Sequence, residues 1–412
     1  MTTPFVRTVI AACFAASAAL LVAAPAISAP SISRSVGKPL SEADKAMKAN
    51  DFATATAKVQ EAQAVEGRTP YDDYTINQFA ANLALKQNDL KTAEKYFTAA
   101  AASPAMPADD RKNIYTVTVQ VATNIQDWPT VATYAKQLQA MNALEANLIE
   151  PYAVALYNTG DQAGALQVAQ TQIAADKAAN RQPSQALLQI VLNGQAGSKD
   201  NAGAIATLEG LVVDYGNPND WARLIEPAFG KGMTDLQALN LYRLRVATDA
   251  TTSVEDYAIM ATVTTKAGYP GETVSMLEHG LAKGEIKPGD QTAAPLAAAR
   301  AKVPGDKREL PGFDAQAKAR KTGDFDVKVA ETYYGYGQYA DAETAARRAM
   351  SKGGVKDPAE APMVLGMALA RQGKNAEAID VFSKVGGNAN EQKIAHLWTL
   401  YCQRKYTTPQ KG

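Results

Sequence analysis

Apolar and small residues recur at helical spacing along most of the chain, most clearly over residues 327–385. In the first half of this stretch they are three or four residues apart before and after a glycine, at Val329, Ala330, Tyr333, Gly337, Ala342, Ala346 and Ala349. The second half repeats the arrangement at Leu365, Gly366, Leu369, Gly373, Ala378, Phe382 and Val385. This spacing predicts two helix–turn–helix units. Equivalent residues are 36 positions apart, and a fixed period of this size is typical of a stacked array.

The same pattern extends over the rest of the chain. Predicted turns fall near residues 50, 88, 126, 160, 199, 234, 268, 304, 337 and 373, which are 33 to 39 residues apart. One pitch throughout favours a single continuous array, because each unit buries its apolar face on its neighbours. The weakest stretch is 289–312, where Pro304-Gly305 and Pro311-Gly312 interrupt a helical pattern. An apolar stripe at Ile394, Leu397, Trp398 and Tyr401 predicts a terminal helix that covers the last unit.

Residues 327–385 resemble the tetratricopeptide (TPR) repeat family. That family has a small residue where its two helices meet, a glycine at the turn, and an alanine followed by an aromatic residue on the second helix. The corresponding residues here are Gly366, Gly373, Ala378 and Phe382. The resemblance implies an all-α fold, a right-handed α-solenoid of about ten TPR-like helix–turn–helix repeats with a C-terminal capping helix.

A second, narrower resemblance covers roughly residues 185–401. Segments 208–212 and 277–284, together with Tyr215 and Trp221, are similar to exported TPR proteins of Gram-negative bacteria. Some members of that group are encoded beside TonB energy-transduction systems. The resemblance therefore implies an envelope protein with a TonB-type system as one partner to consider.

The N-terminus has the features of a signal peptide. Arg7 precedes an apolar run over residues 9–24, and Ala24-Pro25-Ala26 fits a small-x-small cleavage site. The run has about 16 residues, fewer than the ~20 that span a bilayer. We expect export to the periplasm, with no integral membrane segment in the mature chain. A lipid anchor is the alternative, because residues 10–13 loosely match a lipobox at Cys13, but the apolar run continues past that cysteine.

These observations divide the chain into six segments. Ser41, followed by acidic residues, is the first predicted helix start. The predicted organisation is a signal peptide at 1–26, a flexible lead-in at 27–39, TPR-like repeats at 40–180, degenerate TPR-like repeats at 181–312, TPR repeats and a capping helix at 313–405, and a tail at 406–412.

Charge and residue content narrow the classes of function. Lys+Arg and Asp+Glu both number 42, so net charge gives no reason to expect nucleic acid as a partner. If Cys13 leaves with the signal peptide, Cys402 is the one remaining cysteine, and we expect it to be buried. The two histidines, His279 and His396, are 117 residues apart, without the spacing of a zinc site.

Two short motifs resemble nucleotide-binding loops. Gly373-Lys374 is followed by Asn375 rather than by a hydroxyl residue, and residues 335–340 match a dinucleotide fingerprint without the strand that must precede it. Both occur at predicted turns between helices. We therefore expect no cofactor and no enzymatic activity.

TPR arrays bind ligands along the inner surface formed by the first helix of each pair. The repeat register predicts that this surface contains Gln78, Asn82, Lys86, Gln120, Thr123, Asn124, Val154, Tyr157, Asn158, Thr262, Lys266, Glu331, Tyr334, Met363, Met367 and Arg371. Two peptide-binding regions follow. One is rich in amides, at Asn82, Asn124 and Asn158, because side-chain amides can bond to a peptide backbone of any sequence. The other has hot-spot residue types, at Tyr334, Met367 and Arg371.

The sequence favours a non-catalytic periplasmic adaptor or scaffold that binds protein segments on its concave face. One alternative is a solenoid that binds a small ligand or a polysaccharide of the cell envelope. Another is a cell-envelope enzyme with its site in the irregular middle region, around residues 289–312.

Two effects of substitution follow from the repeat register. Alanine at Tyr334, Met367 and Arg371 together should leave the melting temperature near native and weaken partner binding at least tenfold, or about 1.4 kcal/mol. Gly373→Val should destabilise the C-terminal units through turn strain and overpacking. Partner binding and thermal unfolding of the variants check these expectations.

Overall fold

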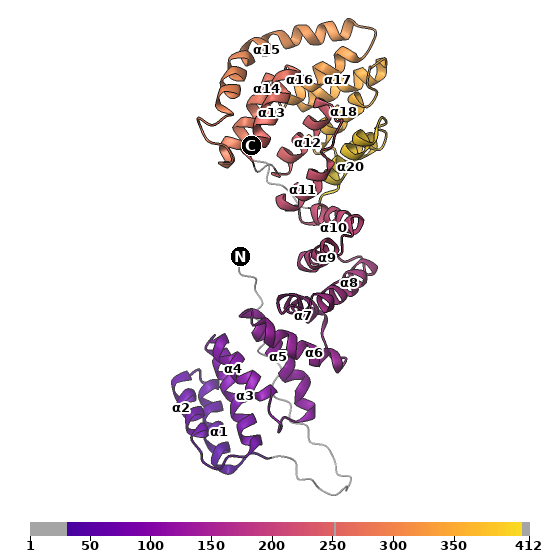
Figure 1. Cartoon of the computed structure of the whole chain (residues 1–412). Coiled ribbons are helices and arrows are strands. Elements are labelled where there is room, and N and C mark those ends of the chain that lie inside the picture. Colours follow the sequence, from indigo (N-terminus) through magenta and orange to yellow (C-terminus); the bar gives the residue numbers. More distant parts are fainter. Residues whose placement is uncertain (1–30, 251–252, 406–412) are drawn as a thin grey trace. The chain divides into compact units, whose positions relative to one another are not determined.

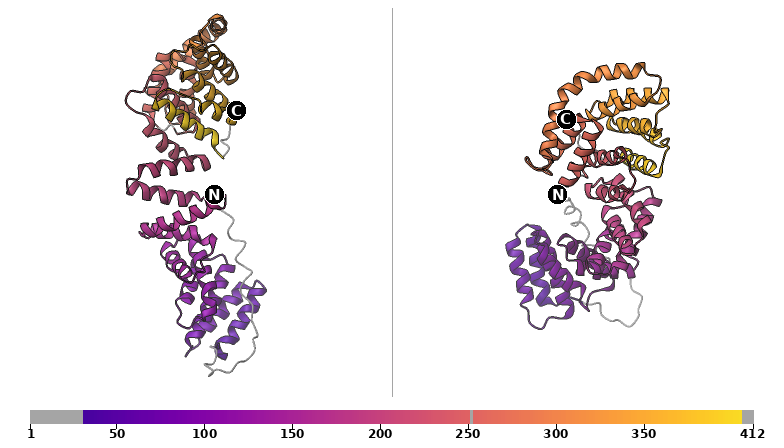
Figure 2. Two further views of the ribbon diagram at one scale, coloured as in Figure 1. Left: turned by 90° about the vertical axis from the view of Figure 1, so that its right-hand side faces the viewer. Right: turned by 45° about the horizontal axis from the view of Figure 1, so that its top comes forward.

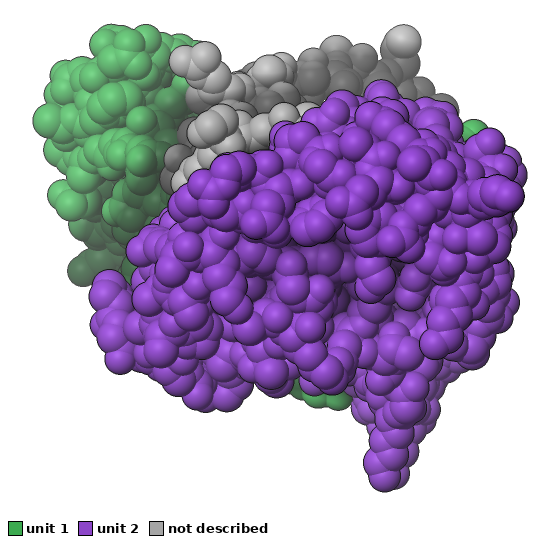
Figure 3. Space-filling view, turned by 90° about the horizontal axis from the view of Figure 1, so that it is seen from above, with its two compact units in different colours: residues 1–194 green, residues 195–412 purple. Residues whose placement is uncertain are grey.

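The computed structural model describes residues 31–250 and 253–405 (Figure 1). These residues form 20 α-helices and two short 3-10 helices, with no strand among them. The predicted all-α solenoid of TPR-like helix pairs is thereby confirmed. The signal peptide, Cys13 and the tail at 406–412 lie outside the described residues. The chain divides into two compact units, residues 1–194 and 195–412 (Figure 3), and each is described separately.

Unit 1 is built of helix pairs. Its helices are α1 (Arg34–Lys48), α2 (Phe52–Gln63), α3 (Pro70–Lys86), α4 (Leu90–Ala101), the 3-10 helix η1 (Ala108–Asp110), α5 (Arg111–Asn124), α6 (Trp128–Ala140), α7 (Ala146–Asn158), α8 (Gln162–Ala178) and most of α9 (Gln185–Gly197). Within the pairs α1/α2, α3/α4, α5/α6 and α7/α8 the second helix packs on the first, and the second helix of each of the first three pairs also packs on the first helix of the next pair.

Unit 2 contains pairs of the same kind and two single helices. Its helices are α10 (Asn201–Asp214), α11 (Pro218–Ile225), the 3-10 helix η2 (Glu226–Ala228), α12 (Asp235–Ala247), α13 (Val254–Ala267), α14 (Pro270–Lys283), α15 (Ala293–Ala319), α16 (Asp324–Gly335), α17 (Tyr339–Lys352), α18 (Glu360–Arg371), α19 (Asn375–Phe382) and α20 (Ala389–Gln403). Figure 1 shows α12 inside the curve that α13 to α20 make.

The turns within the five pairs from α1 to α10 share one local construction. A residue in the left-handed region ends the first helix, and an aspartate then caps the second. Asn50 has φ 60°, the Asp51 amide donates to the Ala46 carbonyl at 2.9 Å, and the Asp51 carboxylate accepts from the Thr54 amide at 3.0 Å. These bonds satisfy backbone groups that both helix ends leave unpaired. The construction recurs at Asn88-Asp89, Gln126-Asp127, Gly160-Asp161 and Lys199-Asp200.

The first helix starts earlier than predicted. Helix α1 begins at Arg34, so the expected flexible lead-in at 27–39 is wrong for residues 34–39. Val36 and Leu40 are one helical turn apart and are both buried. The backbone amide of Ser33 donates to the Asp72 carboxylate at 2.7 Å. Burial of this apolar face extends the helix ahead of the capping signal at Ser41.

The predicted turn near residue 304 does not form. Helix α15 runs without a break through Pro304 and Pro311, and Figure 2 shows its curved course along the edge of unit 2. The described part of the chain therefore contains nine helix pairs plus the single helices α15 and α20, rather than ten pairs. An internal proline costs about 3 kcal/mol. Packing of α15 on α14 and α16, with Leu296 and Leu310 buried, offsets that cost.

Small residues allow the two helices of a pair to approach closely. A Cβ atom on Gly366 would lie 2.5 Å from the Phe382 ring, and a Cβ on Gly280 would lie 2.7 Å from the Tyr257 ring. Real Cβ atoms do not come this near. The turn glycine differs, because Gly373 has φ +74° and its Cβ would meet nothing within 4 Å. Of the two effects expected for Gly373→Val, strain at the turn therefore remains and overpacking is wrong.

We expect substitutions of the two glycines to destabilise unit 2 for different physical reasons. Gly366→Ala should lower the free energy of unfolding by about 1–3 kcal/mol through overpacking, and Gly373→Ala by about 1–2 kcal/mol through left-handed strain. Urea unfolding of unit 2 measures both.

A second substitution separates the two causes. Phe382→Leu leaves room beside residue 366, so it should cost less in the Gly366→Ala background than in the parent chain. The same replacement should give no such relief with Gly373→Ala. Additive costs in both backgrounds would rule out the proposed clash.

Candidate binding site

The predicted site at Tyr334, Met367 and Arg371 is mostly buried. Tyr334 is 8% exposed, Met367 is 0% exposed, and Arg371 is half-buried. Tyr334 and Met367 lie in the interior of unit 2 rather than on an open face. The expectation that all three can be replaced without effect on folding is therefore wrong for Tyr334 and Met367, because truncating a buried side chain leaves a cavity.

Helix α12 covers the face of α16 that was expected to be open. The Arg243 guanidinium donates to both Glu272 carboxylate oxygens, from Nε at 2.6 Å and from Nη2 at 2.7 Å. Its Nη1 lies 2.6 Å from Oε2 of Glu331. The same group lies 4.7 Å from the centre of the Tyr334 ring. One arginine thus joins α12 to α14 and to α16.

This cluster contains two carboxylates for one buried cation. The side chains of Arg243, Glu272 and Glu331 are 1%, 4% and 2% exposed. Burial raises the pKa of Glu331 above its usual value, against the attraction of Arg243. Although burial opposes its charge, the carboxylates of Glu272 and Glu331 hold the pKa of Arg243 well above its usual value. Each charge in the cluster is tolerated because the others are present.

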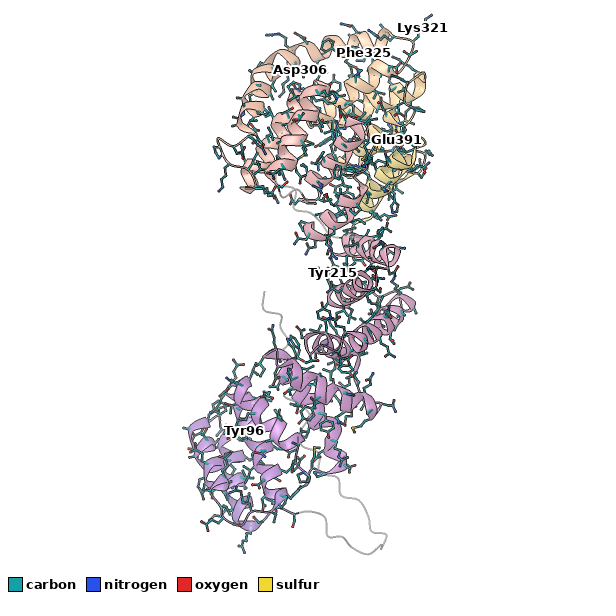
Figure 4. The ribbon with its side chains drawn as sticks, viewed as in Figure 1. Tyr96, Tyr215, Asp306, Lys321, Phe325 and Glu391 are labelled. Carbon is teal, nitrogen blue, oxygen red and sulfur yellow. The ribbon has the colours of Figure 1, made fainter. Side chains whose placement is uncertain are left out.

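Helix α20 encloses α12 from a different side. The Trp398 indole N–H donates to the Asn240 carbonyl at 3.1 Å, and the Gln237 amide donates to the Glu391 carboxylate at 2.9 Å. Figure 4 labels Glu391 on α20. Trp398 and Ile394 are buried, so the predicted capping helix is confirmed, and it covers α12 as well as α19.

Arg371 remains at the edge of this interior. Its guanidinium lies 5.4 Å from the centre of the Tyr339 ring, which in turn meets the Tyr334 ring edge-on at 5.3 Å.

Cys402 is buried as expected, and burial raises the pKa of its thiol to about 12.

The three asparagines of unit 1 remain accessible. Asn82 is half-buried, and Asn124 and Asn158 are exposed. Each donates its side-chain amide to the carbonyl four residues earlier, at 2.9 Å for Asn82, 3.0 Å for Asn124 and 2.8 Å for Asn158. These bonds fix the side chains against their own helices. The side-chain oxygens have no hydrogen-bond partner among the described residues.

The asparagines lie at two levels of the repeat. Asn124 and Asn158 both stand two residues before the left-handed residue of their turn, on α5 and α7, which are in contact. Asn82 stands one helical turn earlier, on α3. Asn193 on α9 is the equivalent of Asn82, is exposed, and donates to the Tyr157 hydroxyl at 3.0 Å. Asn193 precedes Lys199 by the same number of residues as Asn82 precedes Asn88, the left-handed residue of its own turn. Asn193 could therefore have been identified from the sequence.

A separate groove lies in unit 2 between α13, the start of α14, and α15. It has a volume of about 870 Å³. Thr262 and Lys266, both predicted on the inner surface, line it together with Lys302, Asp306 and Arg308 of α15. Figure 4 labels Asp306 on that helix. Sequence reasoning missed the α15 residues because a turn was expected at 304.

The two histidines considered as candidates for a metal or catalytic site each lie beside a carboxylate. His279 lies 3.3 Å from Asp249, and His396 lies 2.8 Å from Glu209. Residues 335–340 run from the end of α16 to the start of α17, with the turn at 336–338, as expected from the repeat. The Tyr336 hydroxyl in that turn donates to Asp306 at 2.6 Å. No group of three metal-ligating side chains occurs in the part of the chain that the structure describes.

A helix that spans a membrane must be both long and apolar. Over residues 31–250 and 253–405, none combines the length and the apolar character needed to cross a bilayer.

Comparison with known proteins supports the repeat assignment in the C-terminal part. Residues 330–390 match the tetratricopeptide repeat family. The match begins in α16 and ends at the start of α20, and so covers the stretch where the sequence pattern is clearest. No curated protein matches the chain.

Three of the solved structures that are similar to this chain are each 12% identical to it. A tetratricopeptide repeat protein from Parabacteroides merdae has a TM-score of 0.28, over 80% of this chain and 98% of that one. Naa15/Naa10 bound to HypK-THB gives 0.35, over 86% and 64%. The P58(IPK) TPR domain gives 0.24, over 88% and 96%. At these scores the similarity carries no argument about ligands.

The arginine cluster predicts unequal effects of two substitutions. Arg243→Met leaves two buried carboxylates without a cation and should cost about 3–5 kcal/mol of unfolding free energy. Glu331→Gln removes the excess negative charge and keeps a hydrogen-bonding group, so it should cost less than about 1.5 kcal/mol. Denaturant unfolding gives both values. Equal costs would contradict the assigned dependence on Arg243.

Proposed function

We propose that the protein is a non-catalytic periplasmic adaptor or scaffold that binds polypeptide segments through the inner face of unit 1. The observation that carries the proposal is the shared geometry of Asn82, Asn124 and Asn158. Export to the periplasm is part of the proposal and rests on the signal-peptide pattern at residues 1–26.

The asparagines provide hydrogen-bonding groups without charge. Each has one amide hydrogen bonded within its helix, which leaves its oxygen as an acceptor and its second hydrogen as a donor. A peptide backbone presents the complementary groups in alternation. Because these side chains are already held by their helices, binding orders them at little further entropic cost. Such a surface binds backbone with little demand on side-chain sequence.

The corresponding face of the C-terminal repeats is filled by the protein itself. Glu331, Tyr334 and Met367 are buried in unit 2. Arg243 of α12 lies against Glu331 and Tyr334, so a partner could reach these two only if α12 left. This contrast favours unit 1 as the place where backbone recognition occurs. The resemblance of residues 185–401 to exported TPR proteins makes a TonB-type system one partner to test.

Site-specific photocrosslinking in cells tests the proposal. A photoreactive amino acid at Asn124 or at Asn158 should capture the same partner protein. Matched controls at Gln137 on α6 and Gln170 on α8, which are also exposed, should capture it at least tenfold less.

Two results would count against a protein-binding role. Equal capture at all four positions would mean that the inner face has no special part in binding. Retention of a polysaccharide on the purified chain, with no protein captured at Asn124 or Asn158, would favour the alternative of a glycan-binding solenoid.

A further inference from the structure

Arg371 on α18 differs from the other arginines that lie out of solvent in unit 2. Each of the others that is buried or half-buried in the described part of unit 2 donates to a carboxylate or to a backbone carbonyl. These are Arg243, Arg245, Arg348 and Arg404. Among the described residues, neither kind of acceptor pairs with Arg371, whose neighbours are tyrosines. Because burying a cation without an anion is unfavourable, an anionic ligand would stabilise this guanidinium.

Three tyrosines from three helices are the neighbours of this guanidinium. It lies 5.4 Å from the centre of the Tyr339 ring on α17. Although burial opposes its charge, Tyr334 on α16, Tyr339 and Tyr401 on α20 hold the pKa of Arg371 above its usual value. Arg371 therefore stays protonated at neutral pH. These neighbours come together only when α16, α17 and α20 pack on α18.

The hydroxyl of Tyr334 is a second unsatisfied group at this place. Tyr334 is 8% exposed, yet its hydroxyl has no hydrogen-bond partner among the described residues. Arg243 lies over the face of the ring, but the charge of Arg371 acts on the hydroxyl more strongly than that of Arg243 does. The hydroxyl end of the side chain thus faces Arg371. Since buried polar groups are nearly always hydrogen-bonded, two donors that face one another point to a ligand that carries acceptors.

The chemistry of these donors favours a carboxylate. A guanidinium presents parallel N–H groups that match the two oxygens of a carboxylate, and the Tyr334 hydroxyl adds another donor. The other arginines beside these tyrosines already have acceptors, since Arg243 holds two carboxylates and Arg404 donates to the Tyr401 carbonyl at 2.5 Å. One free cation suits a single negative charge better than the near-double charge of a phosphate group.

We propose that Arg371 and the Tyr334 hydroxyl bind the carboxylate of a small organic acid, whose apolar part lies against the Tyr339 ring. Arg371 is half-buried at the edge of unit 2, so a small molecule reaches it while α12 stays in place. A polypeptide does not, because Arg243 covers the face of the Tyr334 ring. The site is distinct from the asparagines of unit 1 and does not rest on the role proposed for them.

Isothermal titration calorimetry of the purified full chain with phenylacetate tests the proposal. Phenylacetate should bind saturably and raise the melting temperature. Phenylacetamide, which has the same shape without the charge, should bind at least tenfold more weakly, and so should inorganic phosphate. Absence of saturable binding by phenylacetate, or tighter binding of phosphate, would overturn the proposal.

Variants then locate the site. Arg371→Gln should weaken phenylacetate binding at least tenfold. Tyr334→Phe keeps the ring and removes only the hydroxyl, so it should weaken binding about threefold to tenfold. The matched controls are Arg404→Gln, a nearby cation that already has an acceptor, and Tyr333→Phe, which removes the neighbouring hydroxyl on α16. Both controls should bind phenylacetate as tightly as the parent chain.

Thermal unfolding without phenylacetate verifies that each variant is folded. If Arg371→Gln does not fold, Arg371→Lys keeps the charge, loses the planar fork, and should still weaken binding.

Two further results would overturn the assignment. One is unchanged affinity in both the Arg371 and the Tyr334 variants. The other is an equal loss in Arg404→Gln, which would mean that positive charge in general attracts the acid. Alanine at Asn124 and Asn158 should leave phenylacetate binding unchanged, so failure here is distinguishable from failure of the role proposed for unit 1.

Discussion

The guanidinium group of Arg243 holds carboxylates from two other helices, Glu272 on α14 and Glu331 on α16, at 2.6–2.7 Å. All three groups are removed from water, where an unpaired charge is costly by several kcal/mol. Their helices must therefore take up their places together. The repeat register predicts an open inner face along the first helices of the pairs. Here the arginine fixes α12 inside the curve, and α20 encloses it through Trp398 and Glu391.

Filling the inner face changes where ligands can bind. Residues that the repeat register places on the binding surface, such as Tyr334 and Met367, become core of unit 2. The surfaces that remain open have different chemistry. Unit 1 presents neutral amides held against their own helices, whereas unit 2 has a groove whose lining carries both cations and carboxylates.

Features set by local chemistry could be predicted from the sequence. The turns could be located because a left-handed residue and a capping aspartate stand next to each other, as at Asn88-Asp89. The small residue at Gly366 could be identified because its partner Phe382 lies in the same repeat. The asparagines of unit 1 are accessible where the register put them, and their binding role stays a prediction.

Features set by distant packing could not be predicted. Pro304 and Pro311 are strong local signals for a break, but contacts of α15 with α14 and α16 keep it helical. Nothing near Tyr334 in the sequence shows that Arg243 will cover it. Repeat register gives the direction in which a side chain points, but not what another part of the chain places there.

Hydrogen exchange in α12 tests the self-filled inner face most directly. If α12 is part of the core, the amides of Leu239, Leu241 and Leu244 exchange only when unit 2 unfolds, with the same denaturant dependence as the amides of α16. Exchange of those three amides at a much lower free energy, while α16 stays protected, would contradict the account. It would mean that α12 leaves the inner face and that Tyr334 becomes accessible in the folded protein.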